Sequence, residues 1–192
     1  MYYKILGVFI LDKFNLNKEE AILVIIDIQE RLSRVMEKED EVIKNTNVLI
    51  SMAKTMNMPI IVTEQYPKGL GETVVSISNN LEDAKKFEKT TFSACNKEFI
   101  DFLNKTERKK VIITGMETHV CVYQTVRDLL NAGFSVFVAA DGVCSRTDVN
   151  YRNGLDMMND MGAVISNTET ILFDILKEAG TLQFKALSKL IK

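Results

Sequence analysis

The stretch Val111–Gly133, VIITGMETHVCVYQTVRDLLNAG, decides the fold of this chain. Its first four residues, Val111–Thr114, are apolar or β-branched, which predicts a buried strand. A turn follows at residues 115–119. An apolar face with helical spacing then runs to Gly133, a helix stop signal, and consists of Val122, Val126, Leu129 and Leu130. The stretch is therefore expected to be a strand–turn–helix unit.

Cys121 lies where this strand gives way to the helix. The first N–H groups of a helix have no intrahelical partner and carry the positive end of its dipole. A thiolate is stabilised at such a place, so we expect the pKa of this thiol to be lowered. Nearby N–H groups could also hold an oxyanion. Two interpretations stay open: a nucleophilic cysteine, or a small buried thiol that packs a helix on a sheet.

The length and the net charge of the chain limit the functions that it can have. The 192 residues predict one domain with a sizeable core, and the net charge of -2 attracts neither nucleic acid nor an anionic membrane. We therefore expect neither nucleic acid nor a membrane as partner. Three cysteines without a CxxC pair indicate a reduced, cytoplasmic protein. Because His119 is the single histidine, a His-rich metal site is excluded, and no cofactor is expected.

The first residues, Met1–Leu11, are apolar but do not resemble a signal peptide. Their positive charge is only Lys4, and no small-x-small cleavage site precedes Asp12. The segment is also too short to span a bilayer. The hypothesis is an N-terminal arm over residues 1–19, packed on a neighbouring subunit, ahead of a single domain over residues 20–192.

The run AILVII, Ala21–Ile26, is continuously apolar and ends at Asp27. Such a run is typical of a central strand in a parallel sheet, buried on both faces. Asp27 could be a helix N-cap that forms a capping box with Glu30. It could also be a carboxylate at the carboxyl end of a central strand, where α/β sheets bind ligands. Both interpretations can hold together.

The remaining elements follow from periodicity and turn signals. We expect strands at 60–63, 85–89, 134–140 and 163–165, a turn at Asp141-Gly142, and helices at 39–56, 99–103, 148–161 (N-cap Asp148) and 168–177. Residues 64–80, which contain Pro67, Gly69 and Gly71, predict a loop that walls a pocket. Within it, Gln65 and Tyr66 are either substrate contacts or simply loop residues.

This alternation predicts a three-layer, doubly wound, Rossmann-like α/β fold, with about six parallel strands and helices on both faces. The first and fourth strands would be neighbours, so Asp27 and Cys121 would face one crevice. The carboxylate could take the thiol proton, and an ammonium beside it would favour the thiolate. Lys89, at the end of the third strand, is by default a solvated charge.

Three segments, in this order and spacing, resemble a known family: VIIDIQ at Val24–Gln29, FEKTTFSA at Phe87–Ala94 and TGMETHVCVYQT at Thr114–Thr125. Over about residues 20–178 the chain is similar to the isochorismatase-like cysteine hydrolases. This superfamily includes nicotinamidases, N-carbamoyl amide hydrolases and isochorismatases. The stretch TEQYPKGLGETV further resembles the isochorismatase-domain-containing group, whose substrate is not defined.

The resemblance implies an Asp-Lys-Cys triad, with Asp27 as general base, Lys89 as the lysine and Cys121 as nucleophile. It also implies a non-proline cis peptide at Met116-Glu117, with the N–H groups of Glu117 and Cys121 as oxyanion donors. The implied partner is a small-molecule substrate, and the implied reaction is attack on its C–N amide-type carbonyl, formation of a thioester intermediate and hydrolysis of that thioester. Expected substrate contacts are Gln65, Tyr66, Phe92 and Met116. Family members are commonly homo-oligomers, so a dimer or larger is expected.

At two places the sequence differs from the patterns of particular family members, and each difference disfavours one activity. The region TEQYPKGLG lacks the histidines with which nicotinamidases hold their metal, so we expect no catalytic metal and disfavour that activity. Isochorismatases that cleave a vinyl ether lack the nucleophilic cysteine, so Cys121 disfavours that reaction. These activities remain alternatives, together with a non-catalytic small-molecule-binding or scaffold role. Redox sensing by Cys121 is a weaker alternative, because no resolving cysteine lies nearby in sequence.

Overall fold

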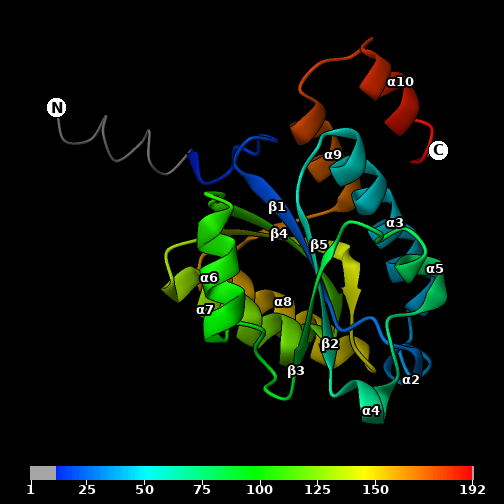
Figure 1. Cartoon of the computed structure of the whole chain (residues 1–192), viewed down its shortest axis with the longest axis vertical. Coiled ribbons are helices and arrows are strands. Elements are labelled where there is room, and N and C mark those ends of the chain that lie inside the picture. The colour runs from blue at the N-terminus through cyan, green and yellow to red at the C-terminus, as the bar shows by residue number, and fades with distance from the viewer. Residues whose placement is uncertain (1–11, 192) are drawn as a thin grey trace, which may run out of the picture.

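The computed structural model describes residues 12–191, which form a six-stranded parallel sheet in the order β3-β2-β1-β4-β5-β6 (Figure 1). All neighbouring strands pair in parallel. The strands are β1 (Ala21–Ile26), β2 (Ile60–Gln65), β3 (Lys85–Lys89), β4 (Lys110–Met116), β5 (Ser135–Cys144) and β6 (Val164–Ser166). This is a doubly wound order, so the predicted fold class is confirmed.

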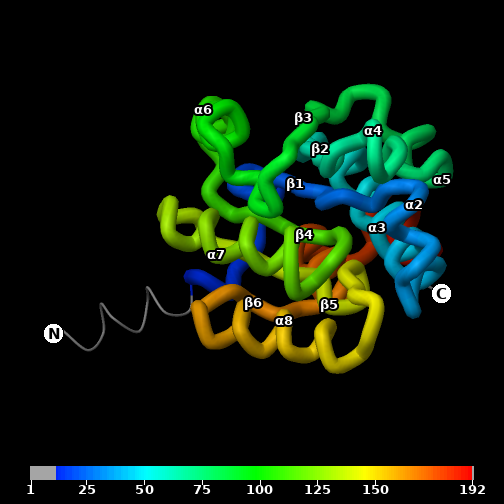
Figure 2. The backbone as a smooth tube through the Cα atoms, turned by 90° about the horizontal axis from the view of Figure 1, so that it is seen from below, coloured from blue at the N-terminus to red at the C-terminus, as the bar shows by residue number. Residues whose placement is uncertain are grey.

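Helices cover both faces of the sheet (Figure 2). One face packs against α3 (Glu39–Thr55), α5 (Val75–Ser78), α9 (Thr168–Leu176) and α10 (Leu182–Leu187). The other packs against α6 (Lys97–Lys105), α7 (Tyr123–Asn131) and α8 (Asp148–Asp160). Two single-turn helices, α2 (Glu30–Ser33) and α4 (Pro67–Leu70), and a π-helical turn, η1 (Thr118–Val122), lie in the connections.

The central strand β1 is buried along its whole length, as its continuous apolar run predicts. Leu23 and Ile25 enter the core beneath α3, whereas Val24 and Ile26 enter the core beneath α7. This alternation follows from the two-residue period of a strand and requires apolar residues at every position. The strand is thereby held rigidly between the two helical layers.

The carboxyl ends of three strands meet beside Asp27. Ile26 pairs with Thr63 of β2 on one side and with Gly115 of β4 on the other. Gly115 has φ +145, and a Cβ there would overlap the carbonyl oxygen of Ile26. Only glycine fits such a close backbone approach. The predicted adjacency of the first and fourth strands is confirmed, and the turn after β4 starts directly beside Asp27.

The predicted turn at Asp141-Gly142 is wrong, because β5 continues through it to Cys144. The register between β4 and β5 shifts along this stretch, and this irregularity accommodates Asp141 and Gly142 within the strand. The Asp141 carboxylate accepts hydrogen bonds from the N–H and hydroxyl of Thr168, and the Gly142 carbonyl accepts one from the Thr114 hydroxyl. Partners distant in sequence therefore satisfy polar groups that would otherwise favour a turn.

Other boundaries differ from the sequence prediction. Residues 64–80 are not a continuous loop, because β2 extends to Gln65 and the short helices α4 and α5 follow. The N-cap of α8 is Thr147, whose side chain accepts from the Asn150 N–H, and not Asp148. The last helix, α10, was not predicted. Single-turn helices offer too few residues for a periodic signal.

The N-terminal arm lies largely outside the described residues, since the structure describes the chain from residue 12 onward. Its role at a subunit interface and the domain boundary therefore stay predictions. The described part packs on its own domain: Leu16 is buried, and its N–H donates to the Asp174 carboxylate of α9 at 2.8 Å. Within residues 12–191, none of the helices has the length and apolar character needed to cross a bilayer.

Candidate active site

Three side chains far apart in the sequence meet at the carboxyl edge of the sheet. Asp27 follows β1, Lys89 ends β3, and Cys121 lies in η1 after β4. The Lys89 ammonium donates to the Asp27 carboxylate at 2.6 Å, and their side chains are 1% and 0% exposed. The charges of Asp27 and Lys89 both act on the nearby Cys121 thiol. An acceptor, a cation and a thiol therefore share one water-poor site.

Asp27 is held by the strand next to it. One carboxylate oxygen accepts from the Thr63 hydroxyl at 2.7 Å, and the Asp27 N–H donates to the Thr63 carbonyl at 3.1 Å. The residue has φ 51, a conformation that aspartate tolerates better than most residues. The capping-box prediction is wrong, because Gln29 is the N-cap of α2 and makes no side-chain cap. The carboxylate is turned toward the sheet edge instead.

Lys89 is buried and fully engaged, so its default interpretation as a solvated charge is wrong. Besides Asp27, its ammonium donates to the Gln65 amide oxygen at 2.7 Å. It also donates to the backbone carbonyls of Phe92 at 3.0 Å and Thr91 at 3.2 Å. The chain after β3 wraps around the ammonium and supplies these carbonyls. Periodicity could not predict them, since backbone acceptors carry no sequence signal.

The pKa of Cys121 is raised to about 12, opposite to the expected direction. Burial of the thiol is the largest cause, and the Asp27 charge adds to it, whereas the Lys89 charge offsets only part. The expectation rested on the dipole at a helix start, but Cys121 lies inside a π-helical turn and is 5% exposed. At neutral pH the residue is a thiol beside a carboxylate acceptor.

The turn that carries Cys121 is fixed by neighbours from two elements. The Met116-Glu117 peptide is cis, as predicted. The Glu117 carboxylate accepts from the Arg146 guanidinium at 2.8 Å, and His119 Nδ1 lies 2.9 Å from the Ser145 hydroxyl. Gly154 of α8 lies so close that a Cβ would approach the His119 nitrogen at 3.0 Å. The supporting roles of Ser145, Arg146 and Gly154 were not predicted from the sequence.

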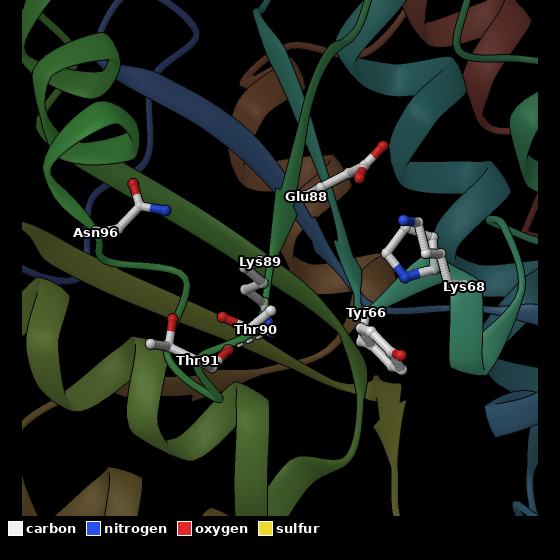
Figure 3. Close-up of a pocket in the computed structure, with 8 residues that line it drawn as sticks. Tyr66, Lys68, Glu88, Lys89, Thr90, Thr91 and Asn96 are labelled. Carbon is white, nitrogen blue, oxygen red and sulfur yellow. Dashed lines mark hydrogen bonds between the residues drawn. The ribbon is translucent and has the colours of Figure 1, made fainter.

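A cavity of about 530 Å³ lies beside the end of β3. Tyr66, Lys68, Thr91 and Asn96 are among the residues that line it, on either side of Lys89 (Figure 3). Tyr66 is 54% exposed and sits in the left-handed region with φ 39. Such a conformation is rare for a bulky residue and is found mostly at turns and functional sites. Cys121 is not among the residues that line this cavity.

The other expected substrate contacts are placed differently. The Phe92 residue is 54% exposed, while its backbone carbonyl is one of the two that accept from Lys89. Gln65 directs its amide oxygen to Lys89 and its amide nitrogen to the Thr90 carbonyl. Met116 is fully buried in the core beneath α3, so its side chain presents no surface to a substrate. The structure therefore leaves Tyr66 and Phe92 as the exposed candidates.

Carboxylates near the site are committed to protein partners. At the end of β2, Glu64 accepts from the N–H and hydroxyl of Thr73 at 2.8 Å each and pairs with Lys86 at 3.1 Å. Burial acts to raise the pKa of Glu64, but Thr73 and Lys86 together outweigh it and the pKa is lowered. In residues 12–191, no cluster of three or more His, Cys, Asp or Glu has a metal-binding arrangement.

The chain is similar in sequence and fold to known proteins. The model of the isochorismatase domain family matches residues 21–170. The secreted isochorismatase effector Isc1 of Phytophthora sojae is 42% identical over 177 residues, covering 90% of this chain and 84% of the relative. Isochorismatase domain-containing protein 2 of Xenopus laevis is 33% identical, with 92% and 85% covered. The solved structure of the MAR1 ribonuclease from Caenorhabditis elegans superposes with a TM-score of 0.88 at 35% identity, covering 92% of each chain.

Proposed function

The chain belongs to the isochorismatase family, and from this premise we propose that it is a metal-independent cysteine hydrolase of a C–N amide-type bond in a small molecule. The observation that carries the proposal is the buried Lys89–Asp27 ion pair within reach of the Cys121 thiol. A buried charge pair costs desolvation energy, so its presence at the carboxyl edge of the sheet, where α/β proteins bind ligands, favours a functional role.

The raised pKa of Cys121 determines how the reaction starts. Because the resting group is a thiol, its proton has to leave as sulfur attacks the carbonyl carbon. The Asp27 carboxylate is the acceptor of that proton, and the Lys89 ammonium stabilises the carboxylate before the transfer. The tetrahedral intermediate then collapses as the C–N bond breaks, and Asp27 returns the proton to the leaving nitrogen. The product of this half-reaction is an S-acyl thioester on Cys121.

Water completes the cycle. Asp27 accepts a proton from the attacking water, whose oxygen bonds to the thioester carbon. The C–S bond then breaks, the proton returns to sulfur, and the carboxylic acid leaves. In both halves, negative charge develops on the former carbonyl oxygen. The N–H groups of Glu117 and Cys121 are the proposed donors to this oxyanion, and the proposal is supported by their proximity, since Glu117 is the N-cap of η1 and Cys121 lies within η1.

The donor set at the end of β2 supports metal independence. Glu64, Gln65 and Tyr66 occupy that place, and the Glu64 carboxylate is already bound to Thr73 and Lys86. An amide and a phenol are poor ligands for a catalytic divalent cation compared with histidine and free carboxylate. The chemistry is therefore assigned to the sulfur and its two ionised neighbours.

The substrate contacts, the oligomeric state and the cellular location are further proposals. Tyr66 and Phe92 are the proposed substrate contacts, because both rings are exposed next to the loop that wraps Lys89. A homo-oligomer and a cytoplasmic location also stay predictions. The Phytophthora sojae relative is described as secreted and as an isochorismatase, so isochorismate is added to the substrates worth testing.

The test is a substrate screen with a matched variant. The wild-type protein and Cys121→Ala are incubated with nicotinamide, N-carbamoyl amines, short aliphatic amides and isochorismate. We expect wild type to hydrolyse an amide and to carry an acyl adduct on Cys121, detected by mass spectrometry after acid quench. Cys121→Ala should lose turnover by roughly 10⁴-fold or more, because no nucleophile remains. Wild-type turnover in Cys121→Ala would show that the proposal is wrong.

A further inference from the structure

The Lys89 ammonium has more acceptors than protons. It carries three N–H groups, and four acceptors surround it: Asp27 at 2.6 Å, Gln65 at 2.7 Å, and the backbone carbonyls of Phe92 at 3.0 Å and Thr91 at 3.2 Å. The two shortest contacts are the two side chains. Although Gln65 is uncharged, its amide oxygen lies 2.7 Å from the ammonium, and the carboxylate of the ionic partner Asp27 lies at 2.6 Å.

The orientation of the Gln65 amide is determined by its surroundings. Its nitrogen donates to the Thr90 carbonyl at 2.9 Å, which leaves the oxygen facing the Lys89 ammonium. The flipped amide would direct two N–H groups at a cation and an oxygen at a carbonyl, so both contacts would become repulsive. Both polar ends are thus committed to the protein.

The backbone of Gln65 is held by a second glutamine. The fully buried Gln29 accepts from the Gln65 N–H at 2.7 Å and donates to the Gln65 carbonyl at 3.0 Å. Its amide nitrogen also donates to the Gly71 carbonyl at 2.7 Å. Gln29 lies two residues beyond Asp27. The segment that carries the carboxylate therefore also positions the residue that shares its lysine.

From this arrangement we infer that Gln65 is a positioning residue, which holds the Lys89 ammonium against Asp27 without adding charge to the site. The inference rests on the proposed function and goes beyond it, because it assigns Gln65 to the lysine and not to the substrate. A carboxylate at this position would compete with Asp27 for the ammonium. It would also oppose formation of a thiolate at Cys121, since like charges disfavour each other.

The titratable groups on the Gln65 side of the sheet edge come from three segments. Asp27 follows β1, Lys89 ends β3, and Cys121 lies in η1. Glu64, Lys86 and Glu88 belong to the opposite face of β2 and β3, because Glu64 is adjacent to Gln65 and pairs in register with Glu88. The charge introduced by Gln65→Glu would therefore act on the Asp27, Lys89 and Cys121 side.

The first experiment needs no substrate. Alkylation of Cys121 by iodoacetamide is followed by peptide mass spectrometry from pH 7 to 10 in wild type, in Gln65→Glu and in Gln183→Glu. Gln183 is exposed on α10, so it gives the same substitution away from the site. Because the pKa of Cys121 is about 12, alkylation of wild type should rise throughout this range. In Gln65→Glu it should be roughly tenfold slower at each pH, about one pKa unit, whereas Gln183→Glu should match wild type.

The second experiment uses the amide found in the screen. In Gln65→Glu the acidic limb of kcat/KM should move to higher pH, because a second carboxylate favours proton uptake by the pair. Gln65→Met, which has similar volume and no acceptor, should lower kcat by roughly tenfold with KM nearly unchanged. This variant carries the test if Gln65→Glu does not fold.

Three results would overturn the inference. Wild-type alkylation together with an unmoved acidic limb in Gln65→Glu would show that the residue does not influence the ion pair. A raised KM with unchanged kcat in Gln65→Met would make Gln65 a substrate contact. A lowered melting temperature with wild-type kinetics in both variants would make it purely structural. The alkylation result is independent of turnover, so it can fail while Cys121→Ala still abolishes hydrolysis, and the reverse.

Discussion

Single residues in this site depend on one another through charge. The Asp27 carboxylate and Lys89 ammonium are buried together, and each is the other's ionic partner at 2.6 Å. Removing one partner of a buried pair is costly because it leaves the other charge uncompensated, whereas removing both at once can be almost neutral. Stability and activity should therefore respond differently to substitutions at these two positions.

This difference gives a prediction for three variants. Asp27→Asn and Lys89→Met should each lower the free energy of unfolding by roughly 3–5 kcal/mol, and the double variant should recover most of that loss. All three should lose roughly 10²-fold or more in kcat, because the proposed general base or its proposed counter-ion is missing. Urea unfolding measures the stability, and the amide assay measures the activity.

The control is Lys97→Met, which removes an exposed lysine paired with Asp101 on α6 and should change neither quantity measurably. If the double variant is less stable than both single variants, the charges do not compensate each other. If it regains turnover, Asp27 and Lys89 do not take part in the reaction.

At the scale of elements, the turn η1 links β4 to α7 and is supported from outside by α8. Gly154 makes this contact, since a Cβ there would lie 3.0 Å from the His119 nitrogen and from two carbon atoms of Thr118. Two of these atoms, the His119 nitrogen and the Thr118 carbonyl carbon, belong to the backbone, so they can move away from a Cβ only if the turn itself moves. The turn carries Cys121 and the proposed oxyanion donors, which makes α8 a support of the reaction geometry.

Gly154→Ala tests this support. Overpacking against η1 should destabilise the protein by about 1–3 kcal/mol, offset in part by about 1 kcal/mol from the better helix former. The displaced turn should lower kcat by roughly tenfold to a hundredfold, because small misplacements of reacting groups are costly. Asn153→Ala, at the exposed neighbouring position of α8, is the control for helix propensity. Wild-type kcat in Gly154→Ala would contradict the assignment.

At the scale of the whole molecule, the doubly wound topology creates the site. The order β3-β2-β1-β4-β5-β6 brings the carboxyl ends of β1, β2, β3 and β4 to one edge, so Asp27, Lys89 and Cys121 meet across gaps of 62 and 32 residues. Right-handed crossovers place successive strands in this way whatever their surface residues are. The site is therefore a property of the complete sheet and not of any local segment.

The assembly prediction also belongs to the whole molecule. The apolar sequence of Met1–Leu11 favours burial against another surface, and we expect the full chain to form a dimer or larger. Deleting residues 1–15 should lower the mass measured by light scattering to that of one truncated chain, which lies below the 21.8 kDa of the 192-residue chain. Cys121→Ala over the full length is the control and should keep the wild-type mass. An unchanged mass after the deletion would remove the arm from the interface.

The sequence alone determined the fold class, the adjacency of β1 and β4, and the placement of Asp27 and Cys121 at the carboxyl ends of these two strands. A continuous apolar run such as Ala21–Ile26 predicts a strand that is buried on both faces. The right-handed crossover rule then predicts which strands are neighbours in the sheet from their order in the chain. The motif around Lys89 was informative only through resemblance, because a lone lysine in a polar strand carries no physical signal of burial.

Four features became visible only in the three-dimensional fold: the raised pKa of Cys121, the carbonyl groups around Lys89, the continuation of β5 through Asp141-Gly142, and the hydrogen bonds of Gln65. Each of these depends on what surrounds a group in space. A residue's type and neighbours in sequence define which hydrogen bonds and charges it can offer, whereas the desolvation and the partners that shift its behaviour come from segments the fold brings alongside it.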